Sequence, residues 1–409
     1  MVGADIAWVL ACSALVLLMT PGLAFFYGGL VGRKNASGTI MHSLTAMGVV
    51  SIVWVLWGYS LAFAPGSTVL GSLLAPFVGG LDFLGLAGVS ADTGVIHGLT
   101  IPDQLMMIFQ AMFAIITPAL ITGAFAERMK FSSYVIFIVL WVTLVYAPVC
   151  HMVWGGGILG EMGALDFAGG TVVHINSGVA ALAAAIIFRK RIGFGSGAGV
   201  PHNVPLVVLG AGLLWFGWFG FNAGSSLAAN GTAVNAFVVT NTAAAAALVT
   251  WVAITWIFGK KASVTGAATG AVAGLVAITP AAGYVGAMPA LIIGIGAGVI
   301  CYSAIAMLAK LNIDDSLAVF GVHGMGGAWG ALATGLFVGV GYGTLADGVT
   351  RVDQIYLQLI AIGVTVAYSF VVTSIILLVI KFTLELEVTV EEERAGIDVS
   401  QHGEEAYMA

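Results

Sequence analysis

The sequence predicts an all-α, polytopic membrane protein with eleven transmembrane helices, and its composition is the first reason. Of its 409 residues, 60% are hydrophobic and only 8% are charged, and the mean hydropathy is +1.07. A soluble domain carries about 25% charged residues, so this chain could not cover a surface that faces water. The 13 basic residues are outnumbered by 19 acidic ones, which argues against a nucleic-acid-binding protein. Soluble enzymes and disordered scaffolds are excluded on the same grounds.

Long stretches without charge predict where the chain crosses the bilayer, since one spanning helix needs about 20 apolar residues. The uncharged stretches 192–259 and 262–309 are each too long for one helix. Each contains turn-forming residues near its middle, Asn230-Gly231 in the first and 280–283 in the second, so each is expected to hold two helices. The eleven expected spans are 6–31, 40–64, 103–126, 131–154, 168–188, 204–226, 233–258, 264–280, 284–308, 317–340 and 355–380.

The basic residues predict the orientation, because cytoplasmic loops carry an excess of Lys and Arg. Twelve of the 13 fall on alternate connections or in the C-terminal tail, and only Arg351 lies on the other side. We therefore expect a multi-pass protein of the cell membrane with its N-terminus outside and its C-terminus in the cytoplasm. Residues 1–384 would form the transmembrane domain and the acidic segment 385–409 a cytoplasmic tail. The first segment lacks a basic leading region and is expected to be a retained span. The outer connection 65–102 follows no recognisable motif.

A faint repeat predicts two related halves. Asp166 precedes His174 by eight residues in the fifth expected span, and Asp315 precedes His323 by eight residues in the tenth. Five is an odd number of spans, so two five-helix halves would have opposite topology, with the eleventh helix added at the end. This is the inverted-repeat plan of many transporters.

Ionisable residues at membrane depth are costly and are therefore candidates for function. His174 and His323 lie six to seven residues inside their spans. They could be two unrelated core histidines, but their equivalent placement favours a pair that shares a proton between ring nitrogens. His151, near the outer end of the fourth span, is expected to anchor at the membrane interface. The three cysteines have no metal-ligand spacing, so we expect no disulfide, metal site or cofactor; they are Cys12, Cys150 and Cys301.

Aromatic residues suggest which kind of ligand would approach the histidine pair. Phe109 and Phe113 are four residues apart and share a helix face, and so do Phe221 and Ser225. Aromatic faces with one hydroxyl can bind a cation that has lost part of its water. The alternatives are an interfacial aromatic belt and ordinary core packing. Asp166 occupies a natural helix-capping position, which is a more probable local role than binding a ligand.

At these residues the sequence resembles the ammonium transporter family (Amt/Mep/Rh), most closely its bacterial and archaeal Amt branch. The similar stretches follow one another in the family's order over nearly the whole chain. They are 20–30 (TPGLAFFYGGL), 113–128 (FAIITPALITGAFAER), 151–157 (HMVWGGG), 166–178 (DFAGGTVVHINSG), 217–225 (GWFGFNAGS), 320–324 (FGVHG) and 396–403 (GIDVSQHG).

The resemblance implies roles for these positions. An outer recruitment site for ammonium is expected at Trp154, Phe113 and Ser225, with Phe109 nearby and Asp166 as a supporting carboxylate. Stacked rings of Phe113 and Phe221 would close the pore below it. The twin histidines, His174 and His323, would line a narrow apolar pore together with Phe26 and Trp218. The resemblance also implies a homotrimer in the lipid bilayer and a PII-type signalling protein as a partner on the cytoplasmic face.

The expected function is therefore nitrogen uptake by a non-enzymatic ammonium transporter. The cation would be recruited outside and deprotonated, and neutral ammonia would cross, with or without separate proton transfer. Three alternatives are compatible with parts of this pattern: a proton-coupled carrier for another small cation such as methylammonium, an intramembrane enzyme or haem protein that uses the two histidines, and a sensor with a vestigial pore.

Overall fold

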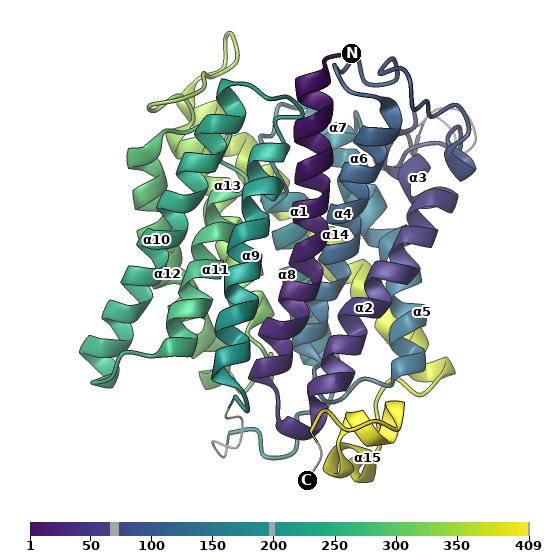
Figure 1. Cartoon of the computed structure of the whole chain (residues 1–409), viewed down its shortest axis with the longest axis vertical. Helices are drawn as coiled ribbons and strands as arrows, with labels where there is room; N and C mark the ends of the chain where they lie inside the picture. Colours follow the sequence, from purple (N-terminus) through teal and green to yellow (C-terminus); the bar gives the residue numbers. More distant parts are fainter. Residues whose placement is uncertain (66–72, 196–200, 408–409) are drawn as a thin grey trace.

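The computed structural model describes residues 1–65, 73–195 and 201–407, which include most of the outer connection 65–102. The regular structure in these ranges is helical, apart from an isolated bridge between Met129 and Glu387. The long helices run alongside one another as a bundle, with the N-terminus at its upper end and the C-terminus at its lower end (Figure 1). We call these two ends the N-terminal face and the C-terminal face.

All eleven expected spans are confirmed, and their ends agree with the expected ones to within four residues. Four spans contain a π-helical turn at or near their middle or start, formed by η2, η5, η6 and η7. The observed helices, with consecutive elements of one span joined by a plus sign, are α1 (Gly3–Leu30), α2 (Ala36–Val53) + η2 (Trp54–Gly58) + α3 (Tyr59–Phe63), α4 (Asp103–Ile121) + η4 (Thr122–Ala124), α5 (Phe131–Trp141) + η5 (Val142–Tyr146) + α6 (Ala147–Trp154), η6 (Gly170–Ile175) + α8 (Asn176–Ile187), α9 (Val204–Gly224), α10 (Gly231–Gly259), α11 (Val264–Ile278), α12 (Ala287–Lys310), η7 (Phe320–Gly324) + α13 (Met325–Phe337) and α14 (Arg351–Thr383).

Within the described residues, nine of these helices are long and apolar enough to cross a bilayer. The other two are α11, with 15 residues, and the span formed by η7 and α13. Both lie largely buried against other helices, so their backbones need not cover the full hydrocarbon thickness. The short elements outside the spans are η1 (Arg33–Asn35), η3 (Leu84–Leu86), α7 (Ile158–Glu161), α15 (Val390–Ala395) and η8 (Asp398–His402).

Side-chain caps explain several helix boundaries. The Asn203 side chain accepts from the Leu206 N–H at 3.0 Å and starts α9, and Asn230 accepts from the Ala233 N–H at 3.1 Å and starts α10. The expected turn at Asn230-Gly231 is thus confirmed. Thr350 and Asp353 form a reciprocal capping box at the start of α14. These caps satisfy backbone N–H groups that have no partner within the first turn of their own helix.

The two spans that carry the repeated Asp–His spacing cross at the centre of the bundle. A Cβ placed on Gly178 of α8 would lie 2.1 Å from the Gly324 nitrogen in η7. The equivalent glycine of the other half, Gly327 of α13, also lies against η6, where a Cβ would be 2.9 Å from the Gly170 carbonyl oxygen. Each glycine stands four residues after its histidine. The contact between the fifth and tenth spans is therefore reciprocal, as expected for equivalent elements of an inverted repeat.

The C-terminal segment packs against the C-terminal face of the bundle, where α15 lies below α2 (Figure 1). The Ile397 N–H donates to Asn35 Oδ1 at 2.9 Å, and the Gly38 N–H donates to Asp398 Oδ1 at 2.8 Å. Ile397 itself is buried. The segment after α14 is therefore bonded to the start of α2 through Ile397 and Asp398.

His151 differs from its interpretation as an interfacial anchor. It is buried, and its Nδ1 and Nε2 atoms lie 3.0 and 2.9 Å from the carbonyl oxygens of Ala62 and Ala75. The loop that follows α3 folds over the end of α6 at the N-terminal face, so the imidazole bonds to backbone groups that would otherwise be unpaired. The three cysteines are buried and free; they are Cys12, Cys150 and Cys301.

Candidate functional site

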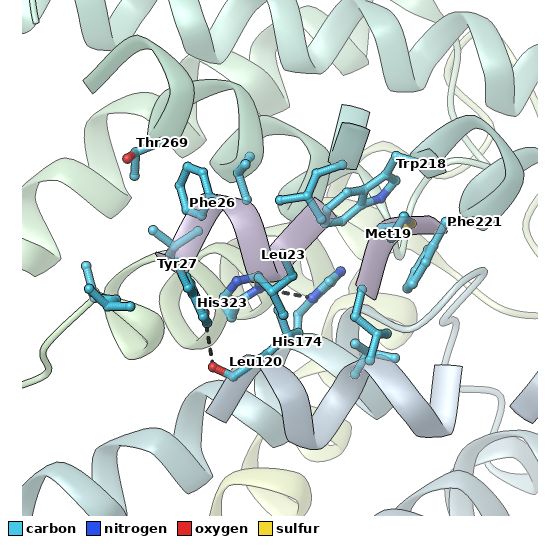
Figure 2. Close-up of a pocket in the computed structure, with 17 residues that line it drawn as sticks. Met19, Leu23, Phe26, Tyr27, Leu120, His174, Trp218, Phe221, Thr269 and His323 are labelled. Atoms are coloured by element: carbon cyan, nitrogen blue, oxygen red, sulfur yellow. Dashed lines mark hydrogen bonds between the residues drawn. The ribbon is translucent and has the colours of Figure 1, made fainter. Parts of the chain in front are cut away.

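The two buried histidines meet at the centre of the bundle. The Nδ1 atoms of His174 and His323 lie 3.3 Å apart, and their ring centroids are separated by 5.3 Å with 29° between the planes. Figure 2 shows the two rings side by side, joined through this contact. Since a nitrogen must donate to a nitrogen that accepts, one ring carries its proton on Nδ1 and the other does not. The pair expected from the sequence repeat therefore exists as a contact, 149 residues apart in the chain.

Each histidine belongs to a π-helical turn that is capped by the aspartate eight residues earlier. The Asp166 carboxylate accepts four backbone N–H bonds of 2.7 to 3.0 Å from residues 169–172 at the start of η6. The Asp315 carboxylate accepts from the N–H groups of Val319 and Phe320 at 3.0 and 2.8 Å at the start of η7. The capping role inferred for Asp166 fits this geometry. The carboxylates set where each turn begins and hence where each imidazole lies.

Aromatic rings continue from the histidine pair toward the N-terminal face. Phe221 lies over His174 with centroids 5.9 Å apart and planes at 18°, and Phe113 lies 4.4 Å from Phe221. Trp154 comes next, 6.0 Å from Phe113 and perpendicular to it. Phe113 and Phe221 are almost fully buried, whereas Trp154 is partly exposed. We call this series the aromatic column; in order, it is Trp154, Phe113, Phe221, His174 and His323.

The remaining candidates lie beside the aromatic column. Phe109 contacts Phe113 edge-on at 5.0 Å, and Trp218 stacks on His174 at 5.3 Å. Ser225 follows α9, one turn beyond Phe221, and its hydroxyl donates to the Phe221 carbonyl at 2.8 Å. Its lone pairs remain able to accept from a ligand. The structure thus gathers the sequence candidates into one region, and only the Asp166 carboxylate is directed to backbone groups instead.

An apolar cavity extends from the histidine pair toward the C-terminal face. Figure 2 shows Phe26 and Tyr27 on one side of it and the two histidines on another. None of the described residues that line it has an ionisable side chain other than Tyr27 and the two histidines. The lining comprises Met19, Leu23, Phe26, Tyr27, Ile116, Leu120, Val173, His174, Leu214, Trp218, Phe221, Thr269, Val272, Leu317, Ala318, Val322 and His323.

Sequence reasoning missed part of this lining. Tyr27 follows Phe26 directly, and its hydroxyl donates to the Leu120 carbonyl at 3.0 Å, so its ring faces the cavity while its polar end is satisfied. Leu317 and Ala318 line the cavity from the loop before η7. A helical periodicity in α1 could have indicated Tyr27, but no local pattern marks the loop residues.

The buried imidazoles have one further property that bears on chemistry. The Nε2 atom of His174 is buried and has no hydrogen-bond partner. Leaving a buried polar atom unpaired costs about 1–3 kcal/mol, and it indicates a place where a small molecule that can donate or accept would be bound. No group of three or more potential metal ligands was found in the part of the chain that the structure describes.

Eleven spans around a buried, uncharged pore-like cavity define a multi-pass membrane transport protein. The model of the Ammonium Transporter Family matches residues 7–407. The chain is 50% identical over 408 residues to an ammonium transporter of Bacillus subtilis, covering 99% of this chain and 98% of that protein. It is 47% identical over 406 residues to the ammonium transporter Amt1 of Archaeoglobus fulgidus, with 98% and 99% covered.

Solved structures agree. The crystal structure of Mep2 from Candida albicans superposes with a TM-score of 0.87 at 37% identity, covering 96% of this chain and 88% of that one. A protein described as a sensor Amt protein superposes with a TM-score of 0.89 at 31% identity, with 98% of both chains covered. The chain therefore belongs to the ammonium transporter family, as its motifs suggested. It is a transporter of ammonium and not an enzyme.

Proposed function

We propose that the chain binds the ammonium ion at Trp154, Phe113 and Ser225, removes its proton, and conducts neutral ammonia past His174 and His323. Phe109 would support the outer site from behind Phe113. The mutual contact of Phe113 and Phe221 would form a gate, since both rings are buried and their centroids are 4.4 Å apart. Below them the route continues along Trp218, the histidine pair and Phe26.

The Nδ1–Nδ1 contact of 3.3 Å between the histidines is the observation that carries this proposal. A pair that shares one proton presents one bare Nε2 and one Nε2–H. Ammonia can donate to the first and accept from the second, so each ammonia molecule finds both kinds of partner without any fixed charge. The unpaired Nε2 of His174 supports this assignment.

The same geometry gives a physical basis for selectivity against potassium, which has the charge of ammonium and a similar size. An ion that enters an apolar cavity loses its hydration, so its free energy of transfer from water is far higher than that of a neutral solute. Ammonium avoids this cost by giving its proton to water on the outer side of the aromatic gate, beside the partly exposed Trp154, whereas potassium has no proton to give. Aromatic faces at the outer site attract the cation before that step.

We place the N-terminal face outside the cell and the C-terminal face in the cytoplasm. Arg128 donates to the Arg189 carbonyl, and both Arg189 and Lys34 donate to Glu393 of the C-terminal tail. The connections that carry these basic residues therefore lie on one face of the bundle. That asymmetry follows the positive-inside rule. We further propose a homotrimer in the bilayer with one pore per subunit, and a PII-type protein as a regulatory partner at the cytoplasmic face.

The proposal is tested by currents after an ammonium concentration jump on solid-supported membranes, with potassium as the control. Wild-type protein in proteoliposomes should give a signal with ammonium and with methylammonium and none with potassium. His174→Ala and His323→Ala should each lose flux or the discrimination against potassium. Wild-type flux and discrimination in both variants would show that the permeant does not pass the histidines.

A parallel measurement of internal pH separates two versions of the mechanism. If the proton crosses separately, ammonium transport is electrogenic and gives a steady current. If only ammonia crosses, the vesicle interior becomes alkaline without a steady current. Either result is compatible with the route proposed above.

A further inference from the structure

A buried arginine outside the pore contacts the loop that forms the inner end of the cavity. Arg128 follows η4 at the C-terminal face, and its side chain is fully inaccessible to solvent. Its NH1 lies 3.3 Å from Asp314 Oδ2, and its NH2 donates to the Asp314 carbonyl at 3.1 Å and to Ser316 Oγ at 2.9 Å. A buried guanidinium is costly unless it is paired and hydrogen-bonded, so this arrangement has a strong energetic preference for one loop geometry.

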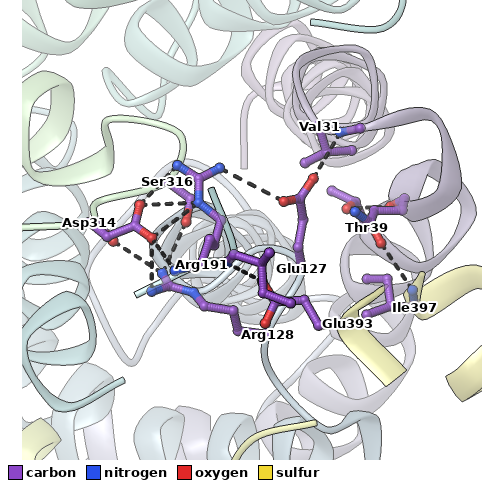
Figure 3. A network of polar contacts seen from close by, with 12 residues as sticks. Val31, Thr39, Glu127, Arg128, Arg191, Asp314, Ser316, Glu393 and Ile397 are labelled. Atoms are coloured by element: carbon purple, nitrogen blue, oxygen red, sulfur yellow. Dashed lines mark hydrogen bonds and ion pairs between the residues drawn. The ribbon is translucent and has the colours of Figure 1, made fainter. Parts of the chain in front are cut away.

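Charge is retained at this buried position. Burial lowers the pKa of Arg128 to about 10, with the neighbouring Asp314 carboxylate acting in the opposite direction, so the guanidinium stays protonated at neutral pH. A second arginine completes the ion pair from the other side, since Arg191 NH2 lies 2.8 Å from Asp314 Oδ1. Figure 3 shows Asp314 and Ser316 between the two guanidinium groups.

The loop 314–318 also bonds to the end of the α4 span. The Leu317 N–H donates to the Gly123 carbonyl at 2.9 Å, and the Ser316 hydroxyl donates to the Ala124 carbonyl at 3.2 Å. Ala318 has a φ of +60°, a conformation that residues with a Cβ rarely adopt. A non-glycine residue remains in that region only when its surroundings determine it. The loop is therefore fixed by its contacts with residues 123–128.

The same loop determines two parts of the pore. Leu317 and Ala318 line the cavity directly. Asp315, between the two residues that Arg128 contacts, caps the π-helical turn that carries His323. A displacement of the loop would therefore move both the inner wall of the cavity and the imidazole that faces His174.

We infer that Arg128 is a positioning residue for transport: its buried guanidinium fixes the loop 314–318 and, through the Asp315 cap, the place of His323 in the pore. This inference rests on the proposed function, because it assumes that the permeant passes His323. Arg128 itself contacts neither the permeant nor the cavity. Its effect should therefore appear in the maximal rate and not in the binding of ammonium at the outer site.

The test is a pair of double-mutant cycles measured as ammonium-triggered currents in proteoliposomes, normalised to folded protein. Arg128→Lys keeps the charge but cannot reach the Asp314 carbonyl and Ser316 together. We expect it to lower the maximal current by about tenfold or more, as a misplacement of about 1 Å does in positioned sites, with the half-saturation concentration unchanged within about twofold. Asp315→Asn should give a loss of similar size.

Arg128→Lys combined with Asp315→Asn should lose little more than either single variant, because both changes act on the same cap. Asp166→Asn supplies the matched control, since Asp166 caps the equivalent turn of the other half. In the double variant, the fold-decrease in maximal current caused by Asp166→Asn should multiply with the fold-decrease caused by Arg128→Lys, because the two changes act on different caps. Losses that multiply in both cycles would overturn the inference, and so would a wild-type maximal current in Arg128→Lys.

Two further variants complete the experiment. If Arg128→Lys is not recovered as folded protein, Ser316→Ala replaces it in both cycles and is subject to the same criteria, because it removes one Arg128 bond without leaving the guanidinium unpaired. Lys130→Gln removes an exposed ion pair to Glu385 at the same face and should keep the maximal current within about twofold. A wild-type result for His323→Ala would refute the proposed pore itself and is distinguishable from any result of these cycles.

Discussion

The indole nitrogen of Trp154 donates to the carbonyl oxygen of Asp166 at 2.8 Å. One residue thus connects two parts of the site, because the Asp166 backbone bonds to the outermost aromatic ring while its carboxylate accepts four N–H bonds from the turn that leads to His174. The proposed outer site and the histidine pair are therefore positioned by the same short segment. The carboxylate has no oxygen left unbonded for direct contact with a cation.

We expect Asp166→Asn to lower the ammonium-triggered current by about tenfold or more, through displacement of the turn and not through loss of a ligand. An amide offers one acceptor oxygen in place of two, and its NH2 group would face backbone N–H donors. The apparent melting temperature in detergent should fall together with the current. Glu161→Gln, a change of an exposed carboxylate on α7, should leave both quantities near wild type. A stable Asp166→Asn protein that has lost only ammonium binding would contradict the capping role.

Ser225 provides the hydroxyl of the proposed outer site. Its proton is used by the Phe221 carbonyl, so it can serve ammonium only as an acceptor. One hydrogen bond contributes about 1 kcal/mol, so Ser225→Ala should raise the half-saturation concentration about fivefold with little change in maximal current. The neighbouring Ser226, whose hydroxyl bonds to the carbonyls of Ala223 and Ala228, is the matched control. Equal half-saturation concentrations for Ser225→Ala and Ser226→Ala would remove Ser225 from the site.

The spans and the histidine pair could be predicted from sequence because their signals are local. Uncharged stretches and turn residues separated the helices, and the spacing of Asp166 to His174, repeated at Asp315 and His323, indicated an inverted repeat. Both signals follow from physics that acts within one segment: the cost of charge in a bilayer and the capping of a helix start.

The inner end of the pore could not be predicted in this way. In the sequence, Arg128 is only one of the twelve basic residues whose distribution predicts the orientation, yet in the structure it pairs with Asp314, 186 residues later. Tyr27 was passed over although it lines the cavity. Such contacts depend on how helices that are distant in the sequence pack together, and neither hydropathy nor residue spacing indicates that packing. His151 was misinterpreted for the same reason, because a loop covers the end of its helix.

The glycines at the crossing of α8 and η7 should be intolerant of a methyl group. In Gly178→Ala the new Cβ would lie 2.1 Å from a backbone nitrogen, which no side-chain rotation can relieve. We expect a loss of about 3 kcal/mol or more, or no folded protein, as judged by size-exclusion profile and melting temperature. Gly212→Ala, on the exposed face of α9 with nothing within 4 Å, should be neutral or stabilising by about 0.5–1 kcal/mol. Similar behaviour of the two variants would contradict the close crossing.

Asp315 should make stability depend on pH near neutrality. Burial raises the pKa of its carboxyl from 3.8 to about 6, against the opposing effect of the N–H groups of Phe320 and Val319. A folded-state pKa above the unfolded one means that the contribution of Asp315 to stability is fully present below about pH 4 and is lost as the pH rises through about 6. The stability of wild type relative to Asp315→Asn should therefore fall by about 1 kcal/mol between pH 5 and pH 7.5, which is measured by thermal unfolding of both proteins in the same detergent. A difference that does not change with pH would show that this carboxyl titrates at its ordinary value.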